Sequence, residues 1–331
     1  RLEYPLIDGV VNGCPSLLLE PQRTNLVTYS EDFSNGDWNK ESGNQVINSN
    51  VETSPSNTLT ADKLTVSSGS ITTRKLWYQQ STTSGLEYTF SVYVKSVTGQ
   101  VNTGFISIAY LDANINETSF TATDIWQRVV VTATANSTTT RFLITGDPNC
   151  QIYIWGAQLE ESSFPTSYIP NYGTIAGVTR SAETANGAGD ATTFNDSEGV
   201  LMAEIAFDSN DGSFKIFGIS DRTLDNRIVF YSNPDSNSIK LLTASSGVTQ
   251  PILDVTVSDI KSYQKILVSY RLNYISFWAN GFEIATDLNT TTPIGLVELS
   301  LDNATNGNPF YGKTKQIQYF QTVLTDSELE Q

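Results

Sequence analysis

The segment from Gln151 to Pro170 reads QIYIWGAQLEESSFPTSYIP, and it divides the chain into two bodies. At its start, Ile152 and Ile154 alternate with aromatic residues, which is the period of two of a β-strand with one buried face. Further on, Pro165 and Pro170 can neither donate a hydrogen bond to a β-ladder nor sit inside a helix. We therefore expect one β-rich body to end here and a second to follow.

Length, composition and charge limit the classes of protein. The 331 residues are enough for two domains of ordinary size. Charged residues make up only 16%, while Ser, Thr and Asn are abundant, which is typical of extracellular or virion β-proteins. The net charge of −16 argues against nucleic acid as a partner, because that binding depends on Lys and Arg. No run of about 20 apolar residues is present, so we expect no membrane insertion. Because the chain starts at Arg1 without Met or a signal-peptide pattern, we expect an upstream region to precede it.

Histidine is absent from the sequence. A Ser-His-Asp triad, a Cys-His pair and His-ligated zinc are therefore excluded. The chemistry that remains is that of paired carboxylates, Tyr, Lys or a metal held by oxygen. The two cysteines, Cys14 and Cys150, lie at opposite ends of the first body, and both a disulfide and two buried free thiols stay open.

The first body has strand-like segments at intervals of roughly a dozen residues, separated by Gly, Asn, Asp or Ser, which is the spacing of a β-sandwich or barrel. In Tyr88–Lys95, apolar residues alternate with polar ones, so we expect one face in the core and the other in water. The predicted strands are Asp62–Val66, Thr72–Gln79, Tyr88–Lys95, Gly104–Leu111, Gln127–Thr134, Arg141–Thr145 and Gln151–Trp155.

The second body starts at Glu198 and shows the same alternation. Asn280 and Gly281 separate two alternating runs, and both positions accept positive φ, so they predict a β-hairpin. Thr325 and Glu328 form a capping box, which predicts a short closing helix. The predicted strands are Gly199–Phe207, Ser213–Ser220, Arg227–Tyr231, Ile239–Thr243, Gln264–Tyr270, Tyr274–Ala279, Phe282–Thr286, Glu298–Asp302 and Gly312–Phe320.

The first body resembles a recurrent module of tailed-phage virion proteins. Its opening, LLLEPQRTNLVTYSEDFSNGDWNK at Leu17–Lys40, and its ending, WGAQLEESSFPTSYIP at Trp155–Pro170, are similar to the two ends of that module. TADKLTV, YTFSVYVKS and DIWQRVVVTATA resemble interior strands, so the resemblance covers most of Ser16–Pro170. It implies a jelly-roll sandwich similar to carbohydrate-binding modules.

The second body resembles the concanavalin A-like or laminin-G-like sandwich over about Gly199–Gln331, through KILVSY, ISFWANGFEIA and GKTKQIQYFQTVLTDSELEQ in that order. The predicted fold class is therefore all-β: two tandem antiparallel β-sandwiches, a jelly roll followed by a concanavalin A-like sandwich, with a short C-terminal helix. The predicted domains are an N-terminal arm (1–24), a jelly-roll carbohydrate-binding-module-like domain (25–170), a linker (171–197) and a concanavalin A/laminin-G-like domain (198–331).

Two pairs of carboxylates are candidates for catalysis. Concanavalin-like glycosidases place carboxylates at period-two spacing along one strand, so that they flank the glycosidic bond. Glu204 with Asp208, and Glu298 with Asp302, are four residues apart, lack the middle carboxylate and lie near strand ends. We therefore expect no catalytic residue and no enzyme activity.

No cofactor is required, but the resemblance to carbohydrate-binding modules allows a structural calcium near Glu31, Asp32 and Glu160. In the second body, Asp208 and Asp211 belong to DSNDG, an oxygen-rich loop that lacks the later ligands of an EF-hand. A β-turn rich in Asp and Asn explains that loop more simply. These five acids are the calcium candidates.

Exposed aromatic residues are the candidates for sugar binding, because their faces pack against the C–H side of a pyranose. Trp77 and Tyr78 are adjacent in a predicted strand and point to opposite faces, so one is expected outside the core. Together with Tyr110, they are the carbohydrate-binding candidates. The 15 Tyr and few Lys also suit contacts between subunits.

The sequence and the resemblance together predict a bacteriophage virion structural protein, a head or tail fibre or a capsid decoration. It would be made in the bacterial host cytoplasm, displayed on the virion surface, extracellular after release, and adhere to host-surface polysaccharide. Its other expected partners are capsid or tail proteins and further copies of itself, with a homotrimer favoured. The alternatives are a tail-spike polysaccharide depolymerase and a structural spacer without a ligand.

Overall fold

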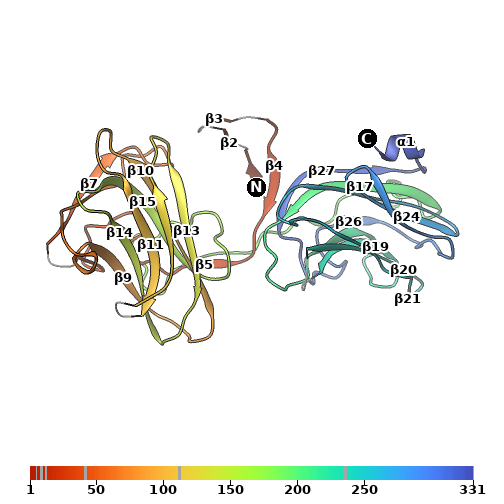
Figure 1. Ribbon diagram of the computed structural model, residues 1–331. Helices are drawn as coiled ribbons and strands as arrows, with labels where there is room; N and C mark the ends of the chain where they lie inside the picture. Colours follow the sequence, from red (N-terminus) through yellow and green to blue (C-terminus); the bar gives the residue numbers. More distant parts are fainter. Residues whose placement is uncertain are drawn as a thin grey trace. The chain divides into compact units, whose positions relative to one another are not determined.

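The computed structural model describes residues 1–4, 6–7, 10–11, 13–40, 43–110, 113–233 and 237–330, and the chain forms two compact units (Figure 1). One, the N-terminal unit, consists mainly of Gln22–Ser181. The other, the C-terminal unit, consists of Ala182–Gln331 with N-terminal segments that end at Pro21. Each unit has its own hydrophobic core.

Over the described residues, the N-terminal unit packs two five-stranded antiparallel sheets face to face. The first sheet runs β13 (Gln127–Thr134), β10 (Glu87–Ser96), β15 (Gln151–Glu161), β8 (Ala61–Val66) and β7 (Gln45–Glu52). The second runs β12 (Ala113–Thr121), β11 (Thr103–Tyr110), β14 (Thr139–Gly146), β9 (Lys75–Ser81) and β6 (Trp38–Lys40). Strands β8 to β15 pass between the sheets in the order of two Greek keys, which confirms the predicted jelly roll.

Smaller elements complete this unit. A 3-10 turn at Ile71–Thr73 precedes β9, and β5 (Arg23–Asn25) pairs with β16 (Val178–Arg180). The sequence does not predict β7 and β12, because both lie at sheet edges where most side chains are exposed and the alternation is lost. Of the predicted strand Gly104–Leu111, the last residue lies outside the described residues.

Strand β10 shows how the alternation builds the core. Phe90, Val92 and Val94 are fully buried between the sheets, and burial of each such side chain contributes about 1.5–3 kcal/mol. The prediction that the opposite face meets water is wrong at Thr89 and Ser91, which are also buried. The chain that follows β15 passes over this face, and Thr89 Oγ1 donates to the Ser162 carbonyl at 2.8 Å. The segment Gln151–Pro170 therefore supplies both the core strand β15 and the chain that covers the outer face of this sheet.

The C-terminal unit is a second antiparallel sandwich. Over the described residues, its larger sheet runs β1 (Leu2–Glu3), β4 (Ser16–Leu19), β27 (Gly312–Phe320), β17 (Glu198–Phe207), β23 (Gln264–Arg271), β24 (Tyr274–Ala279) and β25 (Phe282–Asp287). The facing sheet contains β21 (Val248–Thr249), β22 (Leu253–Thr256), β20 (Ser238–Ser245), β19 (Arg227–Asn233), β18 (Ile216–Ser220) and β26 (Glu298–Ser300). Strands β2 (Leu6–Ile7) and β3 (Val10–Val11) pair separately, and the short C-terminal helix is α1 (Asp326–Leu329). The all-β prediction with tandem sandwiches and a closing helix is confirmed.

Two local predictions in this unit also hold. Asn280 and Gly281 have φ of 51° and 83° and join β24 to β25 as a hairpin. The Glu328 carboxylate accepts hydrogen bonds from the Thr325 N–H at 2.8 Å and from its hydroxyl at 2.7 Å, which begins α1. The helix then buries Leu329 against the larger sheet, beside Met202 and Trp278.

Segments outside the predicted second domain contribute to this sandwich. Strand β4 pairs with β27, and Leu19 is 3% exposed in the core. Phe194 is buried in the same core, and the Asp196 carboxylate accepts the backbone N–H groups of Gly295 at 2.6 Å and Leu296 at 2.9 Å. Residues of the predicted arm and linker thus pack in the core of the second sandwich or bond its loops.

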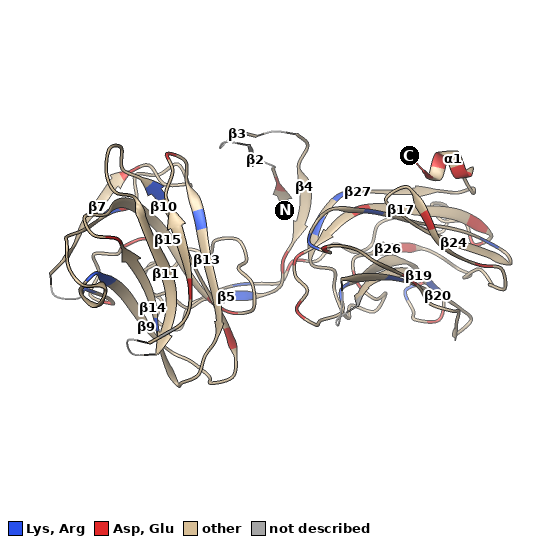
Figure 2. Cartoon of the chain, in the orientation of Figure 1, with Lys and Arg blue, Asp and Glu red and all other residues tan. Residues whose placement is uncertain are grey.

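Charged residues are sparse in both units. Lys and Arg are scattered among Asp and Glu over strands and loops (Figure 2). Within the described residues, we find no helix with the length and apolarity needed to cross a membrane.

Candidate functional site

Trp77 and Tyr78 point to opposite faces of β9, and the core takes Tyr78. The Tyr78 ring lies 5.6 Å from the Trp38 ring between centroids, and the side chain is 5% exposed. Its hydroxyl bonds the Thr28 hydroxyl at 3.0 Å and donates to the Leu26 carbonyl at 3.0 Å. Trp77 is half-buried on the outer face of the sheet.

On that outer face, Trp77 forms a cation–π contact. The Arg141 guanidinium, from neighbouring β14, lies 4.2 Å from the centre of the indole ring. Trp77 pairs with Asn39 of β6 on one side and with Leu143 of β14 on the other. Its Nε1 atom is buried and has no hydrogen-bond partner among the described residues. The indole is therefore positioned firmly and keeps an unused donor.

Tyr110 ends β11 and is 42% exposed. The preceding Ala109 is the cross-strand partner of Arg141, so Tyr110 lies at the end of the same sheet. The residues that follow Tyr110 lie outside the described part of the chain. The three sequence candidates thus belong to one sheet, with Tyr78 on its inner side.

A cleft of about 520 Å³ lies at the β9 edge of the sheet, and of the three candidates Tyr78 is among its lining residues, whereas Trp77 and Tyr110 are not. It forms because β6 is short: its pairing ends at Tyr78, whereas β9 continues to Ser81. The cleft is within the range of about 300–1,000 Å³ typical of small-ligand sites. Its lining residues are Thr28, Gly36, Asp37, Asn39, Tyr78, Gln79, Gln80, Ser81 and Ile175.

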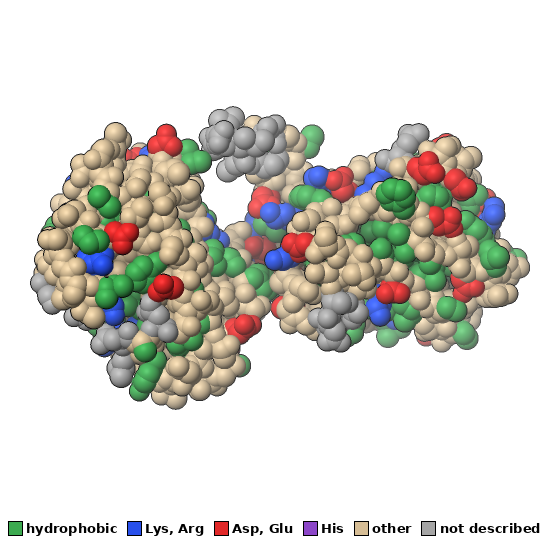
Figure 3. Space-filling model, viewed as in Figure 1, with side chains coloured by type: hydrophobic (Ala, Val, Ile, Leu, Met, Phe, Trp, Pro, Cys, Tyr) green, Lys and Arg blue, Asp and Glu red, His purple; other side chains and the backbone are tan. Residues whose placement is uncertain are grey.

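The lining is polar, and among the described lining residues the charged side chain is Asp37. Amide groups come from Asn39, Gln79 and Gln80, and Ile175, which is 86% exposed, supplies an apolar edge. The face seen in Figure 3 has the same character, since uncharged polar groups and backbone cover most of the N-terminal unit. The sequence did not reveal this cleft, because Ile175 lies far from β9 along the chain.

The calcium candidates of the N-terminal unit have separate protein partners. Glu31 accepts the hydroxyls of Tyr168 and Tyr172, each at 3.0 Å. Burial, together with Glu31, raises the pKa of Tyr168. Asp32 accepts the Ser34 and Asn35 backbone N–H groups within its own loop, at 3.0 and 3.2 Å.

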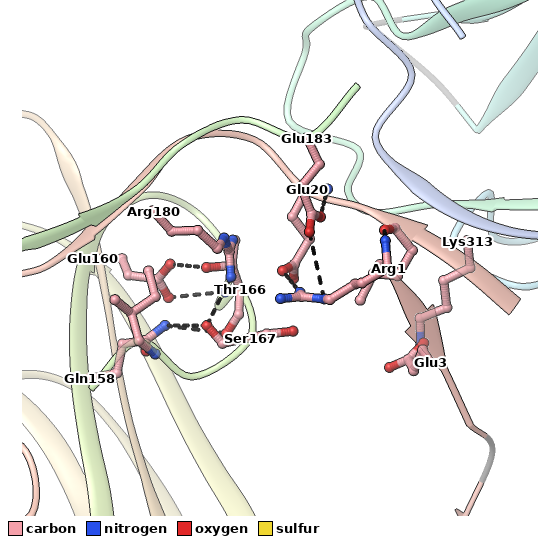
Figure 4. A network of polar contacts seen from close by, with 12 residues as sticks. Arg1, Glu3, Glu20, Gln158, Glu160, Thr166, Ser167, Arg180, Glu183 and Lys313 are labelled. Atoms are coloured by element: carbon pink, nitrogen blue, oxygen red, sulfur yellow. Dashed lines mark hydrogen bonds and ion pairs between the residues drawn. The ribbon is translucent and has the colours of Figure 1, made fainter. Parts of the chain in front are cut away.

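Glu160 is 1% exposed, and its carboxylate accepts both the backbone N–H of Thr166, at 3.0 Å, and the Thr166 hydroxyl (Figure 4). These bonds hold the chain that covers the first sheet after β15. Within the described residues, no group of three or more His, Cys, Asp or Glu side chains is placed to hold a metal ion.

A buried carboxylate that the sequence analysis missed is Asp62. Its two oxygens accept the backbone N–H groups of Phe33 at 3.0 Å and Asn50 at 2.9 Å. Burial raises its pKa to about 6, against the opposing effect of these bonds. A single acid inside the apolar strand TADKLTV was the available signal.

In the C-terminal unit, an ammonium group lies in the DSNDG loop. Lys215 Nζ is 2.7 Å from Asp211 Oδ1, 3.5 Å from Asp208 Oδ1 and 2.9 Å from Ser213 Oγ. Burial raises the pKa of Asp208 to about 6 despite Lys215. Burial also acts on Asp211, but hydrogen bonds from Lys215 and Ser213 outweigh it and lower its pKa to about 2.

The acids weighed for catalysis are each engaged by another side chain. Glu204 pairs with Lys315 at 2.6 Å, and Glu298 pairs with Arg222 at 2.6 Å. Asp302 is buried and accepts the Asn186 amide at 2.6 Å.

The two cysteines are free thiols and form no disulfide with each other. Of the two alternatives, a buried free thiol is therefore correct for Cys150 but not for Cys14. Cys150 is buried in the core of the N-terminal unit, and burial raises its pKa to about 12. Cys14 is exposed. The disulfide is therefore absent from the structure, and one thiol meets solvent.

No family model matches the sequence, and no curated protein matches it. Among solved structures, the Ruminococcus gnavus IT-sialidase CBM40 bound to α2,3 sialyllactose is 17% identical, over 45% of this chain and 95% of that chain, with a TM-score of 0.36. The mouse laminin α1 chain domains LG4-5 are 8% identical, over 74% and 87%, with a TM-score of 0.31. The CBM22-1-CBM22-2 tandem of Paenibacillus barcinonensis Xyn10C is 10% identical, over 92% and 99%, with a TM-score of 0.34.

Proposed function

We propose that this chain is a non-enzymatic bacteriophage virion protein, a head or tail fibre or a capsid decoration, that adheres to host-surface glycans. The observation that carries the binding role is the polar cleft at the β9 edge of the jelly roll's second sheet, which is lined by Tyr78 and by Asn39, the cross-strand partner of Trp77. Its amides and carboxylate can exchange hydrogen bonds with sugar hydroxyls, and the indole offers an aromatic surface. Trp77, Tyr78 and Tyr110 are the proposed aromatic binding residues.

The virion assignment rests on the sequence resemblance of Leu17–Lys40 and Trp155–Pro170 to a phage module. In the proposed domain division, Leu19 belongs to the N-terminal arm and Phe194 to the linker, and both side chains pack in the core of the C-terminal sandwich. A symmetric homotrimer would present three shallow sites, and the resulting avidity would compensate for weak single contacts. Antibody raised against the chain should then label phage particles that carry its gene, and sedimentation should give three times the chain mass.

Glycan adhesion is tested with the full chain, biotinylated and clustered on streptavidin, on a glycan array. Binding to a defined set of glycans is expected, and Trp77→Ala should weaken it about tenfold through lost stacking. Trp126→Ala is the matched control, since Trp126 is also half-buried in the N-terminal unit but lies directly before β13, the edge strand of the other sheet, where its Nε1 donates to the Thr53 carbonyl. A chain that binds no glycan in any format would be a structural spacer instead.

The depolymerase alternative has its own test. Host capsule incubated with the chain should yield no new reducing ends, because the paired acids are engaged by Lys315, Arg222 and Asn186. Release of reducing ends that disappears in Glu298→Gln would overturn the non-enzymatic proposal.

A further inference from the structure

We infer that the cleft beside β9 is a subsite for one neutral sugar ring and that Asp37 makes it discriminate against sugars that carry a carboxylate. This inference rests on the proposed glycan adhesion and adds the class of glycan that the site selects. It follows from three features of the cleft: an uncovered strand edge, an amide-rich lining, and a single negative charge.

The uncovered edge arises from the unequal lengths of two strands. On one side, Gln79, Gln80 and Ser81 of β9 pair with β14. On the other side, β6 pairs with β9 only up to Tyr78, and no further strand follows β6 in the described part of this sheet. An edge strand presents backbone N–H and C=O groups along its free side. Gln79, Gln80 and Ser81 all line the cleft, so a sugar bound there lies next to this free edge.

The side chains around this edge suit a polyol. Asn39, Gln79 and Gln80 each carry an amide that can donate and accept hydrogen bonds. Asn39 Nδ2 donates to the Asp37 carbonyl and Gln80 Oε1 accepts the Tyr78 hydroxyl, each at 3.3 Å, and amide groups have further bonding capacity for sugar hydroxyls. Ile175, exposed at the rim, offers apolar contact for the C–H groups of a ring. Gly36 has no side chain to fill the cleft, and the space around the position of a Cβ atom there is open to 4 Å. The space of about 520 Å³ accommodates a sugar residue with room for its neighbours in a chain.

The charge of the cleft determines which sugars fit. Asp37 is exposed, and its carboxylate can accept two hydroxyls of a neutral ring in charge-assisted hydrogen bonds. A uronic or sialic acid would bring a second carboxylate next to it, and the described lining contains no Lys or Arg to compensate. The nearest lysine in sequence, Lys40, turns toward backbone carbonyls of Ser34 and Trp38, at 3.5 and 3.4 Å. The net charge of −16 acts in the same direction.

The experiment uses the full chain, clustered on streptavidin, against an array of neutral oligosaccharides and their uronic-acid and sialylated counterparts. Wild-type chain should bind at least one neutral glycan and bind the matched acidic glycan at least tenfold more weakly. Gln79→Ala should reduce neutral-glycan binding several-fold, as expected for a lost hydrogen bond. Asp37→Asn should reduce the neutral-over-acidic ratio at least threefold. Asp124→Asn, an exposed acid of the same unit away from the cleft, is the control and should leave the ratio unchanged.

The outcomes separate the inference from the proposed function. If the wild-type chain binds glycans but prefers acidic ones, or if Gln79→Ala and Asp37→Asn both behave as wild type, the cleft is not this subsite while adhesion itself stands. If the wild-type chain binds no glycan, the proposed function fails and this inference with it. Thermal unfolding of each variant, expected within a few degrees of wild type because Asp37 and Gln79 are exposed, excludes misfolding as the cause.

Discussion

Lys215 is a buried charged side chain that holds a loop of the C-terminal unit. It is 2% exposed, and its ammonium lies among oxygens of Asp208, Asp211 and Ser213. Removal of one partner from a buried ion pair leaves the other charge without compensation, which costs more than the pair contributes. The oxygen-rich DSNDG loop is thus held by the ammonium group of Lys215 in place of a bound metal ion.

Lys215→Met should lower the free energy of unfolding of the C-terminal unit by about 3–5 kcal/mol, because Asp208 and Asp211 would then repel each other in a buried site. Urea denaturation followed by tryptophan fluorescence measures the change. Lys261→Met, at an exposed position, is the matched control and should change stability by less than about 0.5 kcal/mol. Equal stability of the two variants would show that the ammonium does not hold the loop.

Two buried acids predict how stability depends on pH. The pKa values of Asp62 and Asp208 are raised from 3.8 to about 6, so the folded state binds protons more tightly than the unfolded state. Stability should therefore fall as pH rises from 3.8 to about 6, by about 1–3 kcal/mol for each group. Asp211, with its pKa lowered to about 2, acts oppositely: the stability it contributes is present above 3.8 and is lost as pH falls toward 2.

Thermal melting across pH should then show a maximum at about pH 3.5–4 rather than at neutral pH. Asp62→Asn should remove part of the slope between pH 4 and 6, and Asp124→Asn should leave it. A stability curve that is flat or rises from pH 4 to pH 7 would contradict the raised pKa values.

At the scale of elements, the short strands β6 and β4 determine the open edge beside the cleft and part of the second core. Strand β6 spans three residues, and because it ends early, β9 keeps an open edge beside the cleft. Strand β4 spans four residues, but it adds Leu19 to the core of a sandwich whose described strands, apart from β1 and β4, begin at Glu198. Neither strand has enough length for a periodic pattern to reveal its pairing partner.

Leu19→Ala tests the role of β4. Because Leu19 is 3% exposed in the core, truncation should destabilise the C-terminal unit by about 2–4 kcal/mol through lost burial and the cavity that remains. Leu2→Ala, at a residue 59% exposed in neighbouring β1, should cost less than about 0.5 kcal/mol. Calorimetry of the full chain measures both, and equal effects would mean that the N-terminal segment is not part of the sandwich.

At the scale of the whole molecule, two cores share one chain. One core contains Phe90, Phe142 and Ile154, and the other contains Phe217, Phe230 and Phe277. Each is large enough to unfold cooperatively by itself. Glycan binding should therefore stabilise the N-terminal unit selectively, because a ligand stabilises the state that binds it.

Calorimetry of the full chain should resolve two transitions. Phe90→Ala should lower one midpoint by several degrees, and Leu19→Ala should lower the other, since each mutation removes packing from one core. A glycan that binds the cleft should raise the transition that Phe90→Ala lowers. A single transition that shifts with both substitutions would show that the units unfold together.

The sequence by itself determined the all-β class, because period-two alternation in segments such as Tyr88–Lys95 is a local property. It also determined the hairpin at Asn280 and Gly281 and the capping box at Thr325 and Glu328, since turn and cap chemistry involve neighbouring residues. For the site, adjacency showed that Trp77 and Tyr78 must face opposite ways.

Tertiary structure alone decided which of the two enters the core, where the cleft lies, and which charges are buried. Tyr78 is inside because its hydroxyl finds Thr28 and Leu26, about fifty residues away. The cleft exists because β6 stops short and Ile175 returns to the same edge. Asp62 is bound by backbone N–H groups of Phe33 and Asn50, which lie 29 and 12 residues away. The partners of Lys215 are local, and its burial is what the surrounding fold supplies. These features arise from long-range contacts, and the period of a single strand carries no information about them.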